Sequence, residues 1–508
     1  MVPACSFPHL TADEAAAFIS NGEMVAFSGF TPAGAAKAVP TAIARRARHF
    51  HERGEPFKIR VLTGASTGPE LDQELAAAEA VSWRAPYQSS PLLRKQINSG
   101  QVEFVDMHLS HVPQALQFGF FGKIDVAVIE ATEITPDGRV YLTTSIGASP
   151  TFLKCAEKVI IEVNRYHSVR LREMADIFLL PSPPHRSPIP ISEPLTKAGW
   201  PFMAIDPRKV IGCVETFAAD TVDAFDPPNE ANRRIAHNVV DFLLAERKAG
   251  RIPPEFLSLQ SGVGNIANAV MAALGENVEV PPFAMYTEVF QDACVDLMER
   301  GRMTGASCCA LTVSPPQLAR IYENMDFFAP RIVLRPQEIS NNPGIIRSLG
   351  VITMNTALEV DIYGHANSTH VAGTQMMNGI GGSGDFTRNS YLSIFMCPSV
   401  AKGGRISSIV PMVTHADHNE HSVQLVVTEW GLADLRGLGP TERARRIIST
   451  CAHPAFRDHL FRYLENARAG HIRHDLGRAF EMHRNLIEHG QMVPGMDLSV
   501  FENEVAGV

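Results

Sequence analysis

Short apolar runs alternate with helix-like or turn-rich segments along most of the chain, and this alternation limits its fold more than any other feature. Apolar runs of this length suit buried strands, and the segments between them are long enough to cross from one parallel strand to the next. The pattern therefore predicts an α/β fold with mainly parallel sheets. In the first half the apolar runs are residues 24–27, 59–62, 102–105, 124–129, 159–163 and 210–214.

The second half of the chain begins as the first half does. Residues 25–29 form an apolar run that ends in Ser-Gly and precedes a small-residue helix, and residues 256–265 repeat this arrangement. An amphipathic helix expected between residues 228 and 250 marks the boundary between the halves. We therefore predict two tandem, mainly parallel α/β domains, residues 1–225 and 226–508, with a helical C-terminal tail from about residue 440 to residue 489.

The overall charge excludes some classes of partner. The chain has 508 residues, a net charge of −9 and a pI of about 6.1, which give no electrostatic reason to expect nucleic acid or an anionic membrane. It contains no apolar run long enough to predict a membrane span, and its N-terminus lacks the basic region and apolar core of a signal peptide. The eight cysteines are scattered, so we expect reduced thiols and a cytoplasmic protein.

Glu288 is the carboxylate whose position is most suggestive. It lies in residues 285–292, where a strand is expected to give way to a helix. Side chains at the carboxyl ends of strands in an α/β sheet line the crevice where ligands bind. A carboxylate in such a place can act as a base or, once desolvated, as a nucleophile. Position alone nevertheless favours a structural glutamate, because most ionisable groups are solvated or paired.

Two further segments carry groups that could bind an anion or orient a carbonyl. Residues 379–384 hold four glycines, whose backbone N–H groups can converge on a phosphate or an oxyanion, although a plain turn explains them equally well. Residues 335–343 end a strand in amide and hydroxyl groups, for which an Asx turn before Pro343 is the simpler explanation. Lys402 is either a phosphate contact or a solvated lysine in a turn.

A histidine-rich loop has the residue types of a metal site. Its candidate ligands lack a helical pattern that would place them on one face, and they lack a partner Cys or His motif. A polar loop with capping and ion-pairing roles is the better interpretation, and we predict no metal site. The candidates are His415, Asp417, His418, Glu420 and His421.

Six segments carry the most specific sequence patterns: residues 260–267, 286–288, 336–341, 355–370, 379–386 and 427–437. Together they resemble the acetyl-CoA hydrolase/transferase family, a branch of the class I CoA-transferases that includes succinyl-CoA:acetate CoA-transferases. The resemblance covers nearly the whole chain, and so many separate matches in one order are hard to obtain by chance. It implies two CoA-transferase α/β domains, the second carrying the nucleophile and most of the CoA site, and a homodimer.

The resemblance also implies the roles of individual residues. Glu288 would be the nucleophile, and it would pass through a mixed anhydride to a glutamyl-CoA thioester. Asn341 and the backbone N–H of Gly382 would bracket the oxyanion of each tetrahedral step. Coenzyme A would be a substrate, delivered as acyl-CoA, and no cofactor would be tightly bound. The resemblance places CoA along Val263, Gly264, Asn265, Ile266 and Ala267, with Asn378, Gly382 and Lys402 completing its site, and Glu429 facing the small carboxylic acid.

We therefore expect an enzyme that moves CoA between a short-chain acyl-CoA, such as succinyl-, acetyl- or propionyl-CoA, and a carboxylic acid. Two alternatives stay open: an acyl-CoA hydrolase on the same site, in which water resolves the thioester, and a non-catalytic acyl-CoA-binding protein. Glu288 and Asn341 disfavour the second alternative. Trp430 is bulkier than the resemblance leads us to expect, and no arginine stands out as a clamp for a second carboxylate, so the acyl specificity is left open.

Overall fold

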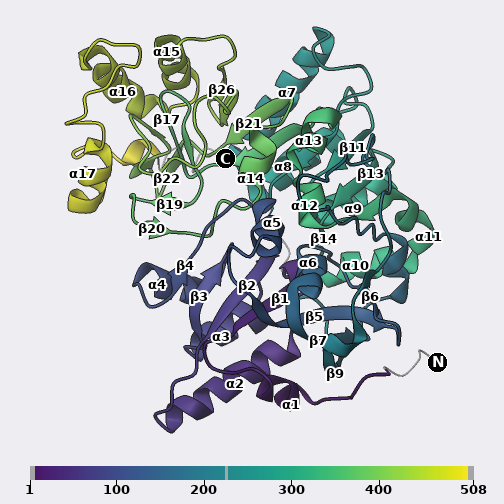
Figure 1. Ribbon diagram of the computed structural model, residues 1–508. Helices are drawn as coiled ribbons and strands as arrows, with labels where there is room; N and C mark the ends of the chain where they lie inside the picture. Colours follow the sequence, from purple (N-terminus) through teal and green to yellow (C-terminus); the bar gives the residue numbers. More distant parts are fainter. Residues whose placement is uncertain (1–5, 223–226, 502–508) are drawn as a thin grey trace. The chain divides into compact units, whose positions relative to one another are not determined.

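The computed structural model describes residues 6–222 and 227–501 (Figure 1). Their contacts divide the chain into two compact units, each built from separate stretches. The predicted division after residue 225 lies outside the described residues and stays a prediction. Unit 1 comprises Met1–Ala224, Ala284–Leu349 and Asn378–Asp385, and unit 2 comprises Phe225–Phe283, Gly350–Met377 and Phe386–Val508.

A nine-stranded sheet forms the first half of unit 1. Its strand order is β4-β3-β2-β1-β5-β6-β8, with β7 pairing β5 and β9. Strand β6 pairs antiparallel with β5 and with β8, and the other pairs are parallel, which confirms the prediction of a mainly parallel sheet. The strands are β1 (Met24–Thr31), β2 (Ile59–Ser66), β3 (Val81–Ala85), β4 (Glu103–Phe104), β5 (Ile124–Ile134), β6 (Arg139–Leu142), β7 (Ala156–Asn164), β8 (Met203–Ala204) and β9 (Val210–Thr216).

Helices bury their apolar sides in the core of this sheet. In α2 the buried side chains recur at helical spacing, as at Val39, Ile43 and Ala47, and they share one hydrophobic cluster with Val25 and Phe27 of β1. This burial fixes the helix against the strands and so sets the position of the loops that follow each strand. The helices are α1 (Ala12–Ala17), α2 (Ala38–Glu52), α3 (Glu74–Ala77), α4 (Pro91–Asn98), α5 (His111–Gln117) and α6 (Ser149–Cys155).

Residues 284–349 return the chain to unit 1. Strands β13 and β15 pair in parallel, and Arg335, which follows β15, is fully buried and forms an ion pair with Asp176. This ion pair holds residues 284–349 to the first stretch of unit 1, because separating the two charges would leave each of them buried and unpaired. The strands are β11 (Phe283–Tyr286), β12 (Val289–Phe290), β13 (Met303–Cys308), β14 (Ala310–Leu311) and β15 (Ile332–Leu334), and the helices are α9 (Asp292–Glu299), α10 (Pro315–Glu323), α11 (Met325–Phe328), α12 (Gln337–Ser340) and α13 (Pro343–Leu349).

Unit 2 contains the strand order β10-β16-β21-β25-β26. Its first three neighbouring pairs are parallel, and the edge strand β26 is antiparallel to β25. The elements are β10 (Leu259–Ser261), β16 (Ile352–Thr356), β21 (Leu392–Met396), β25 (Leu425–Thr428), β26 (Gly431–Asp434), α7 (Glu230–Lys248) and α8 (Asn265–Glu276), and the short strands are β17 (Glu359–Asp361), β18 (Ala366–Asn367), β19 (His370–Val371), β20 (Gln375–Met376), β22 (Val400–Ala401), β23 (Ile406–Ser407) and β24 (Ile409–Val410). The helix α14 (Ser383–Thr387) begins in the part of unit 1 formed by Asn378–Asp385.

The predicted C-terminal tail is helical for most of its length. It consists of α15 (Pro440–Thr450), α16 (Pro454–Asn466) and α17 (Glu481–His489), the last two shown in olive and yellow in Figure 1. Irregular residues 467–480 separate α16 from α17. The tail packs into the core of unit 2, where Ile447, Phe456 and Met482 lie in one buried cluster.

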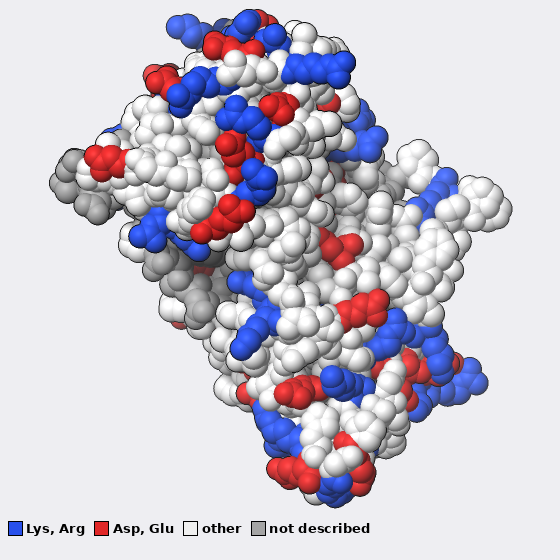
Figure 2. All heavy atoms as spheres, turned by 90° about the vertical axis from the view of Figure 1, so that its left-hand side faces the viewer, with Lys and Arg blue, Asp and Glu red and all other residues white. Residues whose placement is uncertain are grey.

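The surface charges, the helix lengths and the state of the cysteines can be compared with the sequence expectations. Figure 2 shows basic and acidic side chains interspersed on one face of the molecule. Across the described residues, every helix is too short or too polar to cross a bilayer. Cys213 is disulfide-bonded, which differs from the expectation of reduced thiols throughout. The free thiols among the described residues are Cys155, Cys294, Cys308, Cys309, Cys397 and Cys451.

Candidate active site

Glu288 lies where a strand gives way to a helix, as predicted, but a short additional strand comes between Glu288 and that helix. β11 ends at Tyr286, the short strand β12 follows Glu288 directly, and α9 begins only at Asp292. The backbone carbonyl of Glu288 accepts hydrogen bonds from the N–H groups of Cys309 at 2.7 Å and Ala310 at 3.3 Å. These bonds hold the chain at Glu288 against the segment after β13, so the side chain projects from a rigid support.

The environment of Glu288 suits a reactive carboxylate. Glu288 as a whole is partly exposed, but its carboxyl group is buried, and this burial is the main reason why its pKa is raised to about 7. The hydrogen bond from Asn341 lowers the pKa, and the negative charge of Asp385 raises it. A carboxylate that has lost much of its solvation is a stronger nucleophile than a hydrated one. Perturbed carboxyl groups with an identified physical cause are typical of functional sites.

Asn341 donates to Glu288. Its side-chain Nδ2 lies 2.7 Å from Glu288 Oε1, and the asparagine itself is fully buried directly after helix α12. Gln337 at the start of α12 anchors this helix, because its backbone N–H donates to Gly147 O at 3.0 Å and its side chain donates to Leu109 O at 2.7 Å. The amide of Asn341 is therefore held in place by contacts from two other segments of unit 1.

The glycine-rich loop brings Gly382 against the same carboxylate oxygen. A Cβ atom built on Gly382 would lie 1.8 Å from Glu288 Oε1 and 2.4 Å from Asn341 Nδ2, so only glycine allows this approach. The loop is tied down by Asp106, whose carboxylate accepts from the N–H of Ile380 at 2.9 Å. Glu288, Asn341 and Gly382, which lie far apart in the sequence, meet at one point within unit 1.

Asn378 begins this loop and supports it. Its Nδ2 donates to the Tyr87 hydroxyl at 3.3 Å, and its backbone carbonyl accepts from Gln88 N at 3.3 Å. The sequence patterns missed Tyr87, Asp106, Ser110 and Asp385 as members of the site. Asp385 lies within the distinctive segment of residues 379–386, so the sequence could have indicated it. No sequence pattern connects Tyr87, Asp106 or Ser110 with a loop more than 270 residues away.

The predicted CoA-binding residues from 263 to 267 occupy the turn from β10 into α8 in unit 2. Val263 is 45% exposed, and Gly264 precedes α8 with a φ of 125°, a conformation that favours glycine. Asn265 begins the helix, whereas Ala267 is fully buried and can contribute only through its backbone. Ile266 follows Asn265 in the first turn of the helix.

The remaining predicted site residues also belong to unit 2. Lys402 is exposed in the turn between β22 and β23, with a φ of 49°. The Glu429 carboxylate accepts from the Ser399 N–H at 2.9 Å and from its hydroxyl at 2.5 Å. The indole of Trp430 packs edge-on against His453, with ring centroids 5.1 Å apart.

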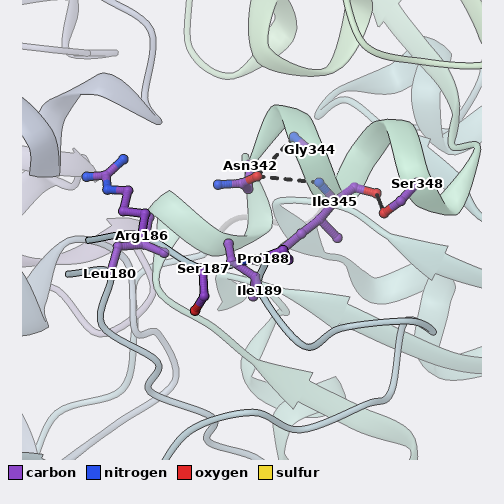
Figure 3. Close-up of a pocket in the computed structure, with 9 residues that line it drawn as sticks. All are labelled: Leu180, Arg186, Ser187, Pro188, Ile189, Asn342, Gly344, Ile345 and Ser348. Atoms are coloured by element: carbon purple, nitrogen blue, oxygen red, sulfur yellow. Dashed lines mark hydrogen bonds between the residues drawn. The ribbon is translucent and has the colours of Figure 1, made fainter. Parts of the chain in front are cut away.

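A cavity lies beside the residue that follows Asn341 (Figure 3). The Asn342 Oδ1 accepts from the N–H of Gly344 at 2.9 Å and so caps α13. The two adjacent asparagines therefore have different roles, one at the carboxylate and one at a helix start. The cavity, of about 350 Å³, is lined by Leu180, Arg186, Ser187, Pro188, Ile189, Asn342, Gly344, Ile345 and Ser348.

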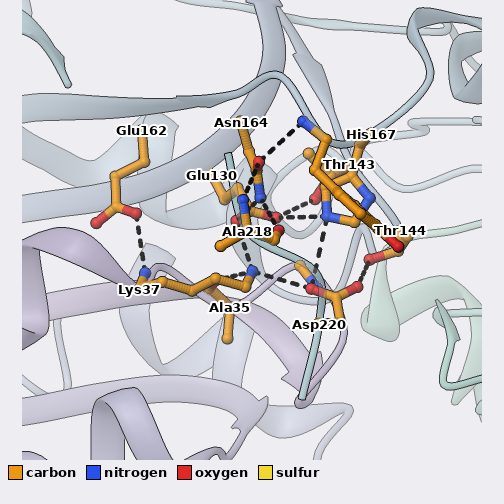
Figure 4. Close-up of polar contacts among 12 residues, drawn as sticks. Ala35, Lys37, Glu130, Thr143, Thr144, Glu162, Asn164, His167, Ala218 and Asp220 are labelled. Carbon is orange, nitrogen blue, oxygen red and sulfur yellow. Dashed lines mark hydrogen bonds and ion pairs between the residues drawn. The ribbon is translucent and has the colours of Figure 1, made fainter. Parts of the chain in front are cut away.

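A second polar cluster in unit 1 has the residue types of a metal site but is filled by a lysine (Figure 4). Buried Glu130, His167 and Asp220 bring their ligand atoms close together. The Lys37 ammonium donates to Glu130 Oε2 at 2.6 Å and to Asp220 Oδ1 at 2.9 Å, where a cation would sit. Burial lowers the pKa of His167, but bonds and charges from Asp220 and Glu130 outweigh this and raise it to about 9. Two cations thus balance two anions, and the cluster is a structural ion network.

The histidine-rich loop in unit 2 is built from local pairs. Asp417 accepts from the Thr369 hydroxyl and the Ser368 N–H, and His415 Nε2 lies 3.3 Å from Asp417. His365 bridges Asp361 and Glu420. These contacts are the capping and ion-pairing roles that the sequence indicated.

Comparison with known proteins now identifies the class. The family model of the acetyl-CoA hydrolase/transferase N-terminal domain matches residues 6–215, and the model of the corresponding C-terminal domain matches residues 318–464. The chain belongs to the acetyl-CoA hydrolase/transferase family, which confirms the resemblance seen in its motifs, and it is an enzyme of the CoA-transferase and acetyl-CoA hydrolase class.

Individual relatives cover almost the whole chain. A propanoyl-CoA:succinate CoA transferase of Escherichia coli is 60% identical over 95% of this chain and 98% of its own length. A succinyl-CoA:acetate CoA-transferase of Clostridium kluyveri is 45% identical, covering 95% and 90%. An acetyl-CoA hydrolase of Schizosaccharomyces pombe is 43% identical, covering 94% of each chain.

Solved structures confirm the fold. RipA from Yersinia pestis superposes with a TM-score of 0.69 at 25% identity, covering 89% of this chain and 96% of that one. A 4-hydroxybutyrate CoA-transferase from Porphyromonas gingivalis superposes with a TM-score of 0.61 at 22% identity, covering 90% and 97%. The second likeness supports the α/β architecture alone.

Proposed function

We propose that this enzyme transfers CoA from a short-chain acyl-CoA to a carboxylic acid through a covalent thioester on Glu288. One observation carries the proposal: Asn341 Nδ2 donates to Glu288 Oε1 at 2.7 Å, while Gly382 packs against the same oxygen. This arrangement presents a nucleophile whose own oxygen already has a donor, as stabilisation of the oxyanion requires when CoA thiolate attacks the glutamyl carbonyl. The identity of 60% to a propanoyl-CoA:succinate CoA transferase supports transfer over other reactions of the family.

The proposed reaction has two mirror-image halves. The Glu288 carboxylate attacks the thioester carbonyl, the C–S bond breaks, and a mixed anhydride forms with release of CoA thiolate. The thiolate then attacks the glutamyl carbonyl, so the donor acid leaves as a carboxylate and Glu288 holds CoA as a thioester. The acceptor carboxylate reverses these steps, and the free energy of the thioester is conserved.

The remaining assignments follow the family resemblance. Asn341 and the Gly382 N–H stabilise each oxyanion, and one such donor typically lowers the barrier by roughly 3 kcal/mol. CoA binds along residues 263–267 and contacts Asn378 and Lys402, while Glu429 faces the acid. We further propose two CoA-transferase domains divided near residue 225, a homodimer, a cytoplasmic location, and CoA thioesters as substrates with no tightly bound cofactor.

A hydrolase is the second candidate, favoured by the acetyl-CoA hydrolase that is 43% identical over nearly the full length. The two reactions differ only in whether water or a carboxylate resolves the intermediates on Glu288.

An acceptor screen separates the two reactions. With propanoyl-CoA, acetyl-CoA or succinyl-CoA alone, we expect slow loss of thioester, because the site conserves the bond until a carboxylate arrives. Adding acetate, propanoate or succinate in turn should accelerate conversion by at least about 100-fold for one pair, the size of effect expected of a positioned reactant. Chromatographic measurement of both CoA esters checks this. Rapid hydrolysis that no acid changes would contradict the transferase.

A further inference from the structure

The Asn341 side chain has two anionic acceptors and not one. Its Nδ2 donates to Glu288 Oε1 at 2.7 Å and to Asp385 Oδ2 at 3.2 Å. A carboxamide nitrogen carries two hydrogens, so each carboxylate can receive one of them. The Oδ1 atom of Asn341 is buried and has no hydrogen-bond partner among the described residues. The orientation of the amide is therefore set from the nitrogen side.

We propose that Asp385 is a positioning residue for catalysis: it keeps the N–H of Asn341 aimed at the Glu288 carbonyl oxygen throughout the reaction. An asparagine amide can turn over and exchange its oxygen for its nitrogen. Turned over, Asn341 would set Oδ1 against two carboxylates, which repel it. This inference rests on the proposed function and adds a residue to it.

The need for Asp385 arises because Glu288 changes its charge during the proposed cycle. In the free enzyme the Glu288 carboxylate itself favours an N–H donor. Once Glu288 has become a neutral anhydride or thioester, that electrostatic preference is weaker, although a donor is still needed at each tetrahedral step. Asp385 is not consumed, so it is the acceptor that persists. Preorganised donors stabilise a transition state best, because they need no reorganisation when charge develops.

Asp385 is itself firmly held. Ser110 donates its backbone N–H to Asp385 Oδ2 at 3.0 Å and its hydroxyl to Oδ1 at 2.6 Å. Both residues are 4% exposed, and Ser110 directly precedes α5. Burial raises the pKa of Asp385, while the bonds from Ser110 and the charge of His108 lower it. The bonds from Ser110 favour the ionised carboxylate, the form that can only accept.

Asp385 lies in the short helix α14, which begins directly after Gly382 of the glycine-rich loop. One short segment thus delivers the backbone donor and orients the side-chain donor. Tyr87, Asp106 and Ser110 fix that segment from the N-terminal part of unit 1. The two donors are in this way coupled to each other as well as to Glu288.

A double-mutant cycle tests this inference on the full-length enzyme. With propanoyl-CoA and succinate as substrates, Asp385→Asn should lower kcat by about tenfold or more, less than loss of the donor itself, with little change in KM. The introduced asparagine is neutral and its own amide can also donate, so it no longer repels the oxygen of a turned-over Asn341 as the carboxylate does. In an Asn341→Ala background the same change should lower kcat by less than about twofold, because the group that it orients is gone. Equal losses in both backgrounds, or no loss in the wild type, would overturn the inference.

A matched control separates positioning from general stability. Asp292 makes the same contact pattern, accepting from the Ser314 N–H and hydroxyl, both at 2.7 Å, but no described contact links it to Asn341. Asp292→Asn should change kcat by less than about twofold, because no contact among the described residues links Asp292 with Glu288 or with Asn341. A loss as large as that of Asp385→Asn would show a general effect and overturn the inference.

A milder variant covers the case in which Asp385→Asn does not fold. Ser110→Ala removes one bond to Asp385 but keeps the carboxylate, so kcat should fall severalfold, again only when Asn341 is present. An equal fall without Asn341 counts against the inference. The proposed function is judged separately, and it fails if the wild type forms no covalent intermediate on Glu288. If the enzyme is an active transferase but the effects of the two substitutions are additive, only the inference about Asp385 fails.

Discussion

Replacing Glu288 with glutamine is expected to lower the kcat of CoA transfer by at least about 10⁴-fold, since removing a nucleophile outright has effects of this size. Glutamine has nearly the same shape, and its side-chain oxygen can still accept the hydrogen bond that Asn341 donates at 2.7 Å. Its amide nitrogen cannot attack a thioester to form an anhydride. The variant should keep its thermal stability and its affinity for CoA, and steady-state kinetics with calorimetric CoA binding measure these quantities.

Glu338 provides the control. Burial raises its pKa to about 7, as it does that of Glu288, and both of its oxygens lack a hydrogen-bond partner among the described residues. It shares the electrostatic perturbation of Glu288 without the donor from Asn341. We expect Glu338→Gln to retain transfer within about threefold, as substitutions outside a reacting centre usually do. A Glu288→Gln enzyme that transfers CoA at a tenth of the wild-type rate would contradict the proposed mechanism.

Adding a single methyl group at Gly382 should be the next most damaging change. The Cβ of alanine would lie 1.8 Å from Glu288 Oε1 and 2.3 Å from its Cδ, so the carboxylate or the loop must move by about an ångström. A displacement of that size costs on the order of 10²-fold in rate, because reacting atoms must stay in near-attack geometry. Gly382 does not have the positive φ that strains alanine, so the loss would come from the collision itself.

The comparison variant is Gly439→Ala. No atom lies within 4 Å of a Cβ at Gly439, and its φ of −73° suits any residue. This change should leave kcat unaltered. If Gly382→Ala retained more than about a third of the wild-type kcat, the close approach of Gly382 to Glu288 would not matter for the reaction, and its assignment beside the oxyanion would be wrong.

The course of the backbone was largely predictable from local pattern. Apolar runs such as residues 24–27 and 124–129 became β1 and β5, since a continuous apolar run bounded by turns suits a strand buried on both faces. The run at 102–105 forms only the two-residue strand β4, because a strand at the edge of the sheet has a neighbouring strand on one side only. The helix expected after Glu288 is present as α9, but the two-residue strand β12 comes before it, because β12 pairs with β14 there, a contact that local pattern cannot reveal.

The candidate site was predictable only in part. Glu288, Asn341 and Gly382 stood out because each lies in a distinctive motif, and the structure brings the three together. Ser110 lies in no such motif. Its bond to Asp385 spans 275 positions of sequence and depends on how α5 packs, which no local periodicity encodes. The burial that raises the pKa of Glu288 is likewise a product of tertiary packing.

The measurement that tests the central claim most directly is the chemical trapping of Glu288. The wild-type enzyme is incubated with propanoyl-CoA or acetyl-CoA, treated with borohydride or hydroxylamine, digested, and analysed by peptide mass. A glutamyl-CoA thioester is an activated acyl group, so we expect borohydride to reduce Glu288 to an alcohol and hydroxylamine to convert it to a hydroxamate, only when acyl-CoA is present. Turnover of acyl-CoA by an enzyme whose Glu288 peptide stays unmodified under both reagents would contradict the account.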